Sequence, residues 1–429
     1  MPIVGTKAAA SSQGFGEFAQ ASTAATYIED VFSTYLYTGT AANRTITNGL
    51  DLSTKGGMVW IKRRNGAGNN WVFDTSRGVL KGLITESTGA QQTSANSLTA
   101  FGTSGFNLGT SSDTNGSGDD NVSWAFREQP KFFDVVTYTG TGSNTTISHN
   151  LGSVPGCIIV KRTDVSGYDW RVYHRSLTSA EYSIQLNATT AEGSGPTIWN
   201  STAPTSTVFS VGTNASVNAS GGTYVAYLFA HNAGGFGLTG TDNVISCGSF
   251  TTDGSGNATV NLGYEPQFII DKPSSTTGNW DCFDVMRGWV ANTSGTNQKL
   301  NPNLANAEVA SNYNFVNSTG FSVIGAATST TYIYIAIRRG PMKTPTTGTS
   351  VFKVPYVRTG GGATQDITGA GYPLNDLVIT KSSSNTQTWA WTDRLRGATN
   401  ELTSAATTAE TAYANDLTSF AYMNGFQVG

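Results

Sequence analysis

An aspartate followed three residues later by an arginine recurs along the chain, and this is the first pattern in the sequence that could do chemistry. It occurs three times, as Asp74 and Arg77, Asp284 and Arg287, and Asp393 and Arg396. Carboxylates can act as acids, bases or nucleophiles, and pairs of them cleave glycosides. Because an arginine accompanies each aspartate, we interpret the pairs as structural ion-pair turns. Ligand binding and catalysis are the two alternatives.

Histidine and cysteine are scarce in the chain. The sequence has three of each: His149, His174, His231, Cys157, Cys247 and Cys282. None of them falls in a metalloprotease, nucleophile-elbow, phosphate-loop or CxxC motif. We therefore predict a protein that is not an enzyme and that binds no cofactor and no metal. The cysteines are too few for a disulfide framework, and free thiols suit assembly in a reducing compartment.

Two further groups of residues could bind a ligand. In the segment 113–120, oxygen-bearing side chains stand at alternate positions, as in calcium loops, but Trp124 stands at the twelfth position, where such a loop needs a glutamate. We interpret this segment as a solvated turn. The aromatic residues Trp60, Tyr168 and Trp199 are expected at loop tips, where they could stack on sugar rings, with core packing as the alternative.

All these residues lie within a pattern that repeats four times. Four apolar segments end in a lysine, at 58–62, 157–161, 268–272 and 377–381, and each precedes a tryptophan, namely Trp71, Trp170, Trp280 and Trp389. The tryptophans are 99, 110 and 109 residues apart. A unit of this length predicts a small β-sandwich. The second copy has His174 and Leu177 at the Asp and Arg positions.

A closing strand follows in the first three copies, at 122–127, 224–229 and 332–338. It is apolar on both faces, which predicts a central strand buried on both sides. In the fourth copy the sequence given ends at Gly429, before such a strand. We expect either that the native polypeptide runs on or that another chain donates the strand.

Composition favours the same fold class. The 429 residues include 50 glycines, only 12% are charged, the net charge is −3, and 11% are aromatic. These values disfavour a disordered chain and a nucleic-acid-binding protein, and no apolar run is long enough to insert into a membrane. We predict an all-β protein, a tandem array of four antiparallel sandwich units of jelly-roll or lectin-like type. The predicted parts are an anchoring segment, 1–32, and the units 33–130, 131–236, 237–343 and 344–429, the last of them incomplete.

The repeated residues resemble a domain found in virion proteins of marine bacteriophages, among them tail and tail-fibre proteins of viruses of cyanobacteria. The resemblance rests on the Tyr37-Thr-Gly-Thr turn, the segment 59–62, the Trp71-to-Gly78 segment, Phe106-x-Leu108-Gly109 and the Tyr/Trp-rich closing strand. It implies a non-catalytic structural protein of the virion, assembled in the host cytoplasm, and a homo-oligomer, with a trimer favoured. It carries no catalytic residues over to this chain, and the second and fourth copies depart from its pattern.

The resemblance and the array together predict the role of the chain. We expect a rod-like spacer, a host-receptor-binding element, or both, in the tail or a tail fibre, with neither nucleic acid nor an inserted membrane as a partner. Residues 1–32, with Phe15, Phe18, Tyr27 and Phe32, are predicted to dock onto other virion proteins. The alternatives are a lectin-like adhesin that binds a host surface glycan and, in second place, a polysaccharide depolymerase.

Overall fold

In the computed structural model, the described residues are 25–291, 297–353, 364–368, 375–384, 386–413, 416–420 and 425–429. They form 33 strands and only short helical turns, all paired sheets are antiparallel, and the all-β prediction is confirmed. The helical turns are η1 (Ile28–Asp30), α2 (Ser112–Asn115), α3 (Pro196–Trp199), α4 (Ala215–Asn218), η2 (Val285–Arg287) and η3 (Gly348–Ser350). None of the helices in this described part of the chain has the length and apolar character needed to cross a bilayer.

The first pair of sheets sets a strand order that returns along the chain. We call each such pair a unit. The larger sheet of the first unit runs β1 (Phe32–Thr38), β9 (Asp120–Arg127), β3 (Gly57–Arg63), β4 (Trp71–Asp74), β5 (Lys81–Ile84) and β6 (Gln92–Thr93). Its smaller sheet runs β2 (Arg44–Thr47), β8 (Gly105–Leu108) and β7 (Leu98–Gly102).

The second unit repeats this order. Its larger sheet runs β10 (Phe133–Thr139), β17 (Thr223–Ala230), β12 (Pro155–Arg162), β13 (Arg171–His174), β14 (Tyr182–Gln185) and β15 (Gly193–Ser194). Its smaller sheet pairs β11 (Thr145–Ser148) with β16 (Val208–Val211).

The third unit follows the same plan. Its larger sheet runs β18 (Ile245–Thr251), β26 (Thr331–Arg338), β20 (Pro266–Pro273) and β21 (Asp281–Asp284). The smaller sheet runs β19 (Ala258–Asn261), β25 (Gly320–Val323) and β24 (Asn314–Asn317), and a hairpin joins β22 (Asn297–Lys299) to β23 (Val309–Ser311).

The closing strands β9, β17 and β26 lie where the sequence predicted them, inside their sheets. Each pairs on both sides, for example β17 with β10 and with β12. The β-branched and aromatic residues of these strands favour extended backbone, and both faces of each strand are buried. One face lies inside its own unit, and the other belongs to a core that the first three units share.

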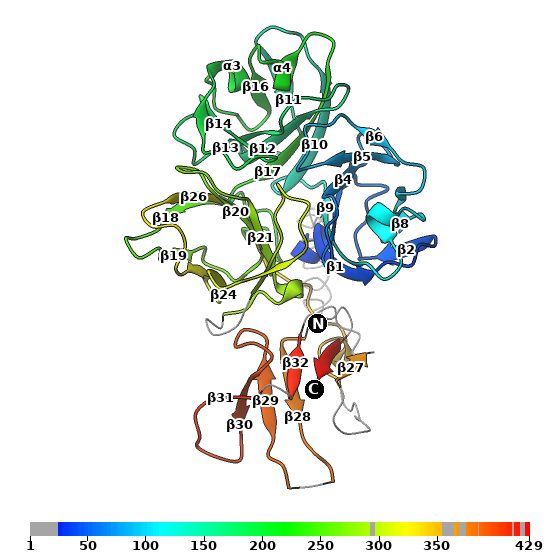
Figure 1. Cartoon of the computed structure of the whole chain (residues 1–429), viewed down its shortest axis with the longest axis vertical. Helices are drawn as coiled ribbons and strands as arrows, with labels where there is room; N and C mark the ends of the chain where they lie inside the picture. The colour runs from blue at the N-terminus through cyan, green and yellow to red at the C-terminus, as the bar shows by residue number, and fades with distance from the viewer. Residues whose placement is uncertain are drawn as a thin grey trace, which may run out of the picture.

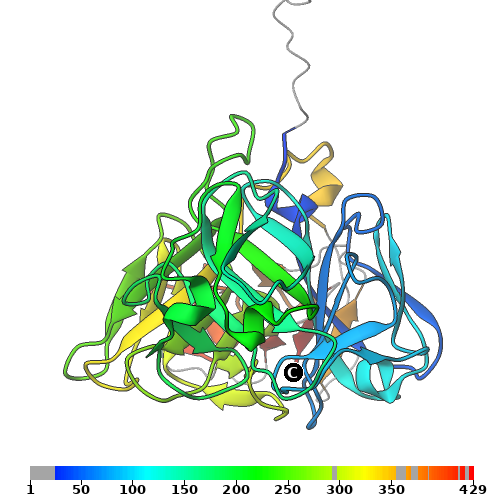
Figure 2. The ribbon, with the colours of Figure 1, turned by 90° about the horizontal axis from the view of Figure 1, so that it is seen from above.

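This shared core determines how the three units are arranged. They lie around a common centre, in blue, green and yellow, and not end to end (Figure 1). Seen from above, the first and third units flank the second (Figure 2). Phe126 of the first unit contacts Phe229 of the second at 5.7 Å and Phe268 of the third at 6.1 Å between ring centroids. The three units therefore do not form the end-to-end row that a rod requires, which corrects this part of the prediction.

The fourth unit lies outside this group. One sheet runs β28 (Leu377–Thr380), β29 (Ala390–Asp393), β30 (Asn400–Thr403) and β31 (Thr411–Ala412), and the other runs β27 (Gln365–Thr368), β33 (Gly425–Val428) and β32 (Leu417–Ser419). It docks on the third unit, where Arg394 pairs with Glu265 and the Ala291 amide donates to the Leu395 carbonyl at 2.9 Å. Among the described residues β28 pairs only with β29, whereas β3 pairs with both β4 and β9. The exact unit boundaries stay a prediction.

Candidate functional site

The aspartate–arginine pairs are turn clasps, as the sequence indicated. The Asp74 carboxylate accepts from the Arg77 backbone amide at 2.8 Å and from the Arg77 guanidinium at 2.5 Å. Asp284 and Arg287 repeat this geometry at 3.0 and 2.6 Å. Both side chains of the Asp284–Arg287 pair are fully buried. These carboxylates hold a turn and face no open cleft.

The clasps of the first and third units also contact the closing strand of the next unit around the shared centre. The Tyr227 hydroxyl of the second unit donates to Asp74 of the first at 2.7 Å. The Trp124 indole N–H of the first unit donates to Asp284 of the third at 3.0 Å, and the Arg287 guanidinium lies 5.5 Å from the centre of a Trp124 ring. These clasps therefore hold their own turns and also connect neighbouring units.

In the second unit His174 takes the place of the aspartate. It pairs with Cys157 across the sheet, as Asp74 pairs with Met58. Its Nε2 lies 3.1 Å from the Tyr334 carbonyl of the third unit, and its Nδ1 accepts from the Ser176 amide. Because a carbonyl only accepts, Nε2 carries the proton. Because Nδ1 accepts a hydrogen bond, it carries no proton, and the ring is neutral. Burial lowers the pKa of His174 to about 4, which agrees with a neutral ring.

A second contact recurs between the same units at one strand position. The Trp170 indole donates to the Ile84 carbonyl at 3.0 Å, and the Trp280 indole donates to the Gln185 carbonyl at 2.8 Å. In the first unit Asn70 fills this position, and its amide donates to the Asn301 carbonyl at 3.3 Å. This set runs from second to first, third to second, and first to third unit, so it closes a ring.

The sheet register corrects one predicted repeat marker. The sequence pattern aligns Trp71 with Trp170, Trp280 and Trp389. In the sheet register, Trp71 lies one strand position later than these three tryptophans. Trp71 belongs to the β4 segment that pairs with Ile61, and it points into the core of its own unit. Trp170 and Trp280 point into the shared core. Side chains alternate along a strand, so a shift of one residue moves the ring to the other face.

Backbone hydrogen bonds complete the ring. The Gly68, Gly167 and Gly278 amides donate to the Ala305, Thr88 and Thr189 carbonyls of the neighbouring unit at 2.8, 2.9 and 2.8 Å. In the reverse direction, three amides donate to the neighbour at 2.8 to 2.9 Å, from Gln91 to Thr163, Glu192 to Ser274 and Glu308 to Arg64. Sequence reasoning missed this second set. Its signal is a glutamate or glutamine after the fifth strand of each of the three units (β5, β14 and β22), which only the sheet register aligns.

The third unit holds a pair of buried aspartates that the sequence did not single out. The Tyr313 hydroxyl contacts both carboxylates, Asp271 at 3.1 Å and Asp281 at 2.5 Å, and the Asn314 amide donates to Asp271 at 2.8 Å. Burial and the neighbouring Asp281 raise the pKa of Asp271 well above its ordinary value. Asp271 has no exposed surface, and its contacts with Tyr313 and Asn314 fasten neighbouring strands.

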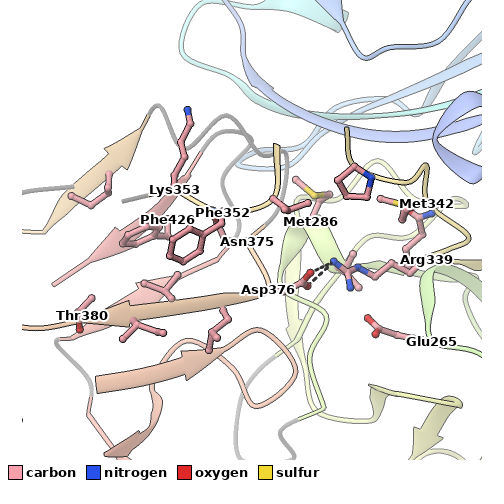
Figure 3. A pocket seen from close by; sticks show the side chains of 18 of the residues that line it. Glu265, Met286, Arg339, Met342, Phe352, Lys353, Asn375, Asp376, Thr380 and Phe426 are labelled. Carbon is pink, nitrogen blue, oxygen red and sulfur yellow. Dashed lines mark hydrogen bonds and ion pairs between the residues drawn. The ribbon is translucent and has the colours of Figure 1, made fainter. Parts of the chain in front are cut away.

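The large cavity, of about 2470 Å³, lies between the fourth unit and the first and third units. Figure 3 shows Met286, Arg339 and Glu265 on one side and Asp376, Phe352 and Phe426 on the other. The Arg339 guanidinium pairs with Asp376 at 2.6 Å. The aromatic side chains Phe352, Trp389 and Tyr413 line the cavity and stay exposed. The cavity therefore has exposed aromatic rings that could bind a ligand. Its carboxylates at Glu265 and Asp376 form ion pairs with Arg394 and Arg339.

The predicted aromatic contacts have different outcomes. Trp60 in β3 and Trp199 in α3 are buried, so the expectation that they lie exposed at loop tips is wrong. Trp60 packs against Trp124 in the shared core, and Trp199 packs against Tyr173 of its own unit. Tyr168 is half-buried, and the Arg162 guanidinium lies 4.5 Å from its ring centre. In the segment 113–120, the structure forms α2 and a turn. Among the described residues no cluster of His, Cys, Asp or Glu could hold a metal ion.

Two of the four predicted anchoring residues lie within the described part of the chain. Phe15 and Phe18 lie outside the described residues. Tyr27 is half-buried, and Phe32 begins β1 and is buried, with its ring 5.0 Å from Phe126 and 5.3 Å from Phe268. Phe32 is thus a core residue of the ring, because its face of β1 points to the shared centre. The three cysteines are buried and unpaired with one another, as expected.

Comparison with protein families shows what the chain is similar to. The profile of a family described as a domain of unknown function, DUF7483, matches residues 28–341 and 348–429. This span covers all four units. No curated protein matches the chain.

Proposed function

We propose that this chain, which belongs to the DUF7483 family, is a non-catalytic structural protein of a bacteriophage virion, in the tail or a tail fibre. The observation that supports it most is the use of the recurring charged residues. The clasps of the first and third units, Asp74 with Arg77 and Asp284 with Arg287, are buried in contacts between units. A protein that serves as a building block needs such fixed junctions, and catalysis needs reachable groups.

We assign a different role to each part of the chain. Residues 1–32 are proposed to attach the protein to other virion proteins, and the fourth unit projects away from the ring of the first three (Figure 1). The ring is then a rigid body between an attachment segment and an outer unit. This arrangement replaces the rod as the spacer, because the three units gather around one centre.

Immunogold electron microscopy of purified particles tests this proposal. Antibodies raised against the ring should label one fixed position on the tail or fibre. Absence of the chain from purified particles, by labelling and by mass spectrometry, would remove the proposal. Phe32 is a buried core residue of the ring, so the deletion is best made over residues 1–24, which leaves Phe32 in place. The deletion should abolish incorporation.

A lectin-like role is the second candidate, and the cavity favours it. Apolar sugar faces stack on exposed aromatic rings, and Phe352, Trp389 and Tyr413 line the cavity with exposed surface. A glycan array with the whole chain tests it, with Phe352→Ala combined with Tyr413→Ala as the site variant. Binding that survives this variant, or no binding at all, would contradict a sugar site here. Release of reducing ends from host polysaccharide would instead support a depolymerase.

A further inference from the structure

The fourth unit has an exposed apolar surface. In the first three units the equivalent surface is buried between the units. Four side chains define it, and we call them the open face: Leu377, Ile379, Trp389 and Leu402, which are 49, 40, 47 and 41% exposed. The first three of them also lie at the rim of the large cavity. Apolar residues of this size are ordinarily buried, and a group of them on one sheet face marks an interaction surface.

The sheet register identifies what the same positions do in the ring. Leu377 and Ile379 face Asp393 and Trp391 across the strand pair, as Met58 and Trp60 face Asp74 and Val72. Leu402 faces Trp391, as Leu83 faces Val72. The corresponding residues of the first three units are all buried in the shared core: Met58, Trp60, Leu83, Cys157, Ile159, Ile184, Phe268, Ile270 and Leu300. The open face is therefore the fourth unit's version of a surface that elsewhere packs against two sister units.

The fourth unit also contains the residues that make polar contacts between units in the ring. Trp389 stands where Trp170 and Trp280 stand, four residues before the clasp position. No hydrogen bond of its indole N–H is found within the described residues. The matching acceptor is the carbonyl of Thr403, which pairs with Ala390 as Ile84 pairs with Trp71.

The clasp of the fourth unit is formed but uncovered. Arg396 donates to Asp393 and reaches Glu410 at 3.3 Å, as Arg287 reaches Glu308 at 2.8 Å. The side chains of Asp393 and Arg396 are 32 and 25% exposed, whereas those of Asp284 and Arg287 have no exposed surface. In the ring, a closing strand of the next unit covers this place.

We propose that three copies of the chain associate through the open faces of their fourth units and form a ring like that of the first three units. Each contact is heterologous, because Trp389 of one copy meets Thr403 of the next. A heterologous contact closes when its rotation divides a full turn. The same indole-to-carbonyl contact already belongs to a set that closes after three units within the chain, so the copies should close as a trimer.

The mass of the full chain in solution tests this directly. Light scattering after size exclusion should give three times the 45.1 kDa of one chain. Leu377→Asp combined with Ile379→Asp places charges on the open face and should give a monomer, with the circular dichroism of the ring unchanged. Leu238→Asp is the matched control, since Leu238 is 84% exposed and lies outside the open face, and it should stay trimeric.

Chemical cross-linking then tests the neighbours within the trimer. Copies that carry only Trp389→Cys are mixed with copies that carry only Leu402→Cys, whose side chain lies on the open face next to Thr403, and a short bismaleimide should link the two kinds of copy into dimers. Each thiol adds across one maleimide double bond, so no oxidant is needed, and the native cysteines are buried. Each copy has one reactive thiol, so no link can form within a copy, and the Leu377→Asp and Ile379→Asp changes should abolish the covalent dimers.

Three results would overturn the proposal. The first is a monomer or dimer for the unaltered chain at tens of micromolar, and the second is a trimer that survives the Leu377→Asp and Ile379→Asp changes. The third is a mass that exceeds three copies and rises with protein concentration, which would indicate an open filament. A monomer that binds glycan at Phe352 and Tyr413 would assign the surface to a sugar. The proposal does not depend on the virion assignment, so labelling of particles and the solution mass can fail separately.

Discussion

The first three units and the fourth unit are built on one strand order, but they differ in what covers them. In the ring, the clasp of Asp284 and Arg287 is closed over by Trp124 of the neighbouring unit. In the fourth unit the clasp of Asp393 and Arg396 lies partly in solvent, beside the apolar side chains of the open face. The same sequence pattern is therefore a core element in one place and a surface in the other.

The difference teaches that the repeated residues serve contacts between units more than the inside of a unit. Clasp, donor position and backbone amides all reach across a junction in the ring. If this is right, equivalent substitutions should have large effects in the ring and small effects in the fourth unit. Measurements on the fourth unit are best made in the Leu377→Asp and Ile379→Asp background, where the chain is expected to be monomeric.

The largest expected effect comes from removing a buried clasp arginine. Arg287→Met leaves the fully buried Asp284 without its cation, and breaking a buried pair in this way costs about 3–5 kcal/mol. Arg396→Met should cost at most about 1 kcal/mol, because its pair is partly exposed. Urea unfolding followed by tryptophan fluorescence measures both. Equal losses for the two variants would break the comparison.

Acid should weaken the ring through His174. Its pKa is lowered by burial to about 4, against 6.5 for an unperturbed histidine, so between these values the unfolded chain binds more protons than the folded chain. Stability due to His174 is complete above pH 6.5 and is lost as the pH falls toward 4, by up to about 3 kcal/mol. Unfolding free energies measured from pH 7 to 4 report this slope.

The variant His174→Gln should remove its share of that slope. His231, whose pKa burial also lowers to about 4, keeps its own share and serves as the internal reference. An unchanged slope in His174→Gln would show that the ring is not held by a neutral histidine at this junction.

A smaller effect is expected at the indole donor. Trp280→Phe removes the hydrogen bond to the half-buried Gln185 carbonyl and shortens a buried side chain, which together cost about 1–3 kcal/mol. Trp389→Phe should change the stability of the monomeric background by less than about 0.5 kcal/mol, as surface substitutions do. Thermal unfolding resolves the two, and a loss at Trp389 as large as at Trp280 would mean that its indole is already engaged within one chain.

The sequence predicted the fold class and the clasps because both depend on local patterns. Alternation and β-branched residues indicate strands, and Asp74 and Arg77 are close enough in sequence to form a turn. The ring was not predicted, because a row of units and a ring of units have the same periodicity. The buried positions of Trp60 and Trp199 were missed for the same reason: the sheet faces that bury them are completed by other units or by distant segments. Trp71 was misaligned because a shift of one residue is invisible without strand pairing.

The central claim is that the first three units form a closed ring, and hydrogen exchange at three glycines tests it most directly. The amides of Gly68, Gly167 and Gly278 each donate to a neighbouring unit, and only Gly68 lies at the junction that joins the first unit back to the third. Mass spectrometry of exchanged peptides should show similar protection at all three sites. Fast exchange at Gly68 with protection at Gly167 and Gly278 would show an open row of units and contradict the ring.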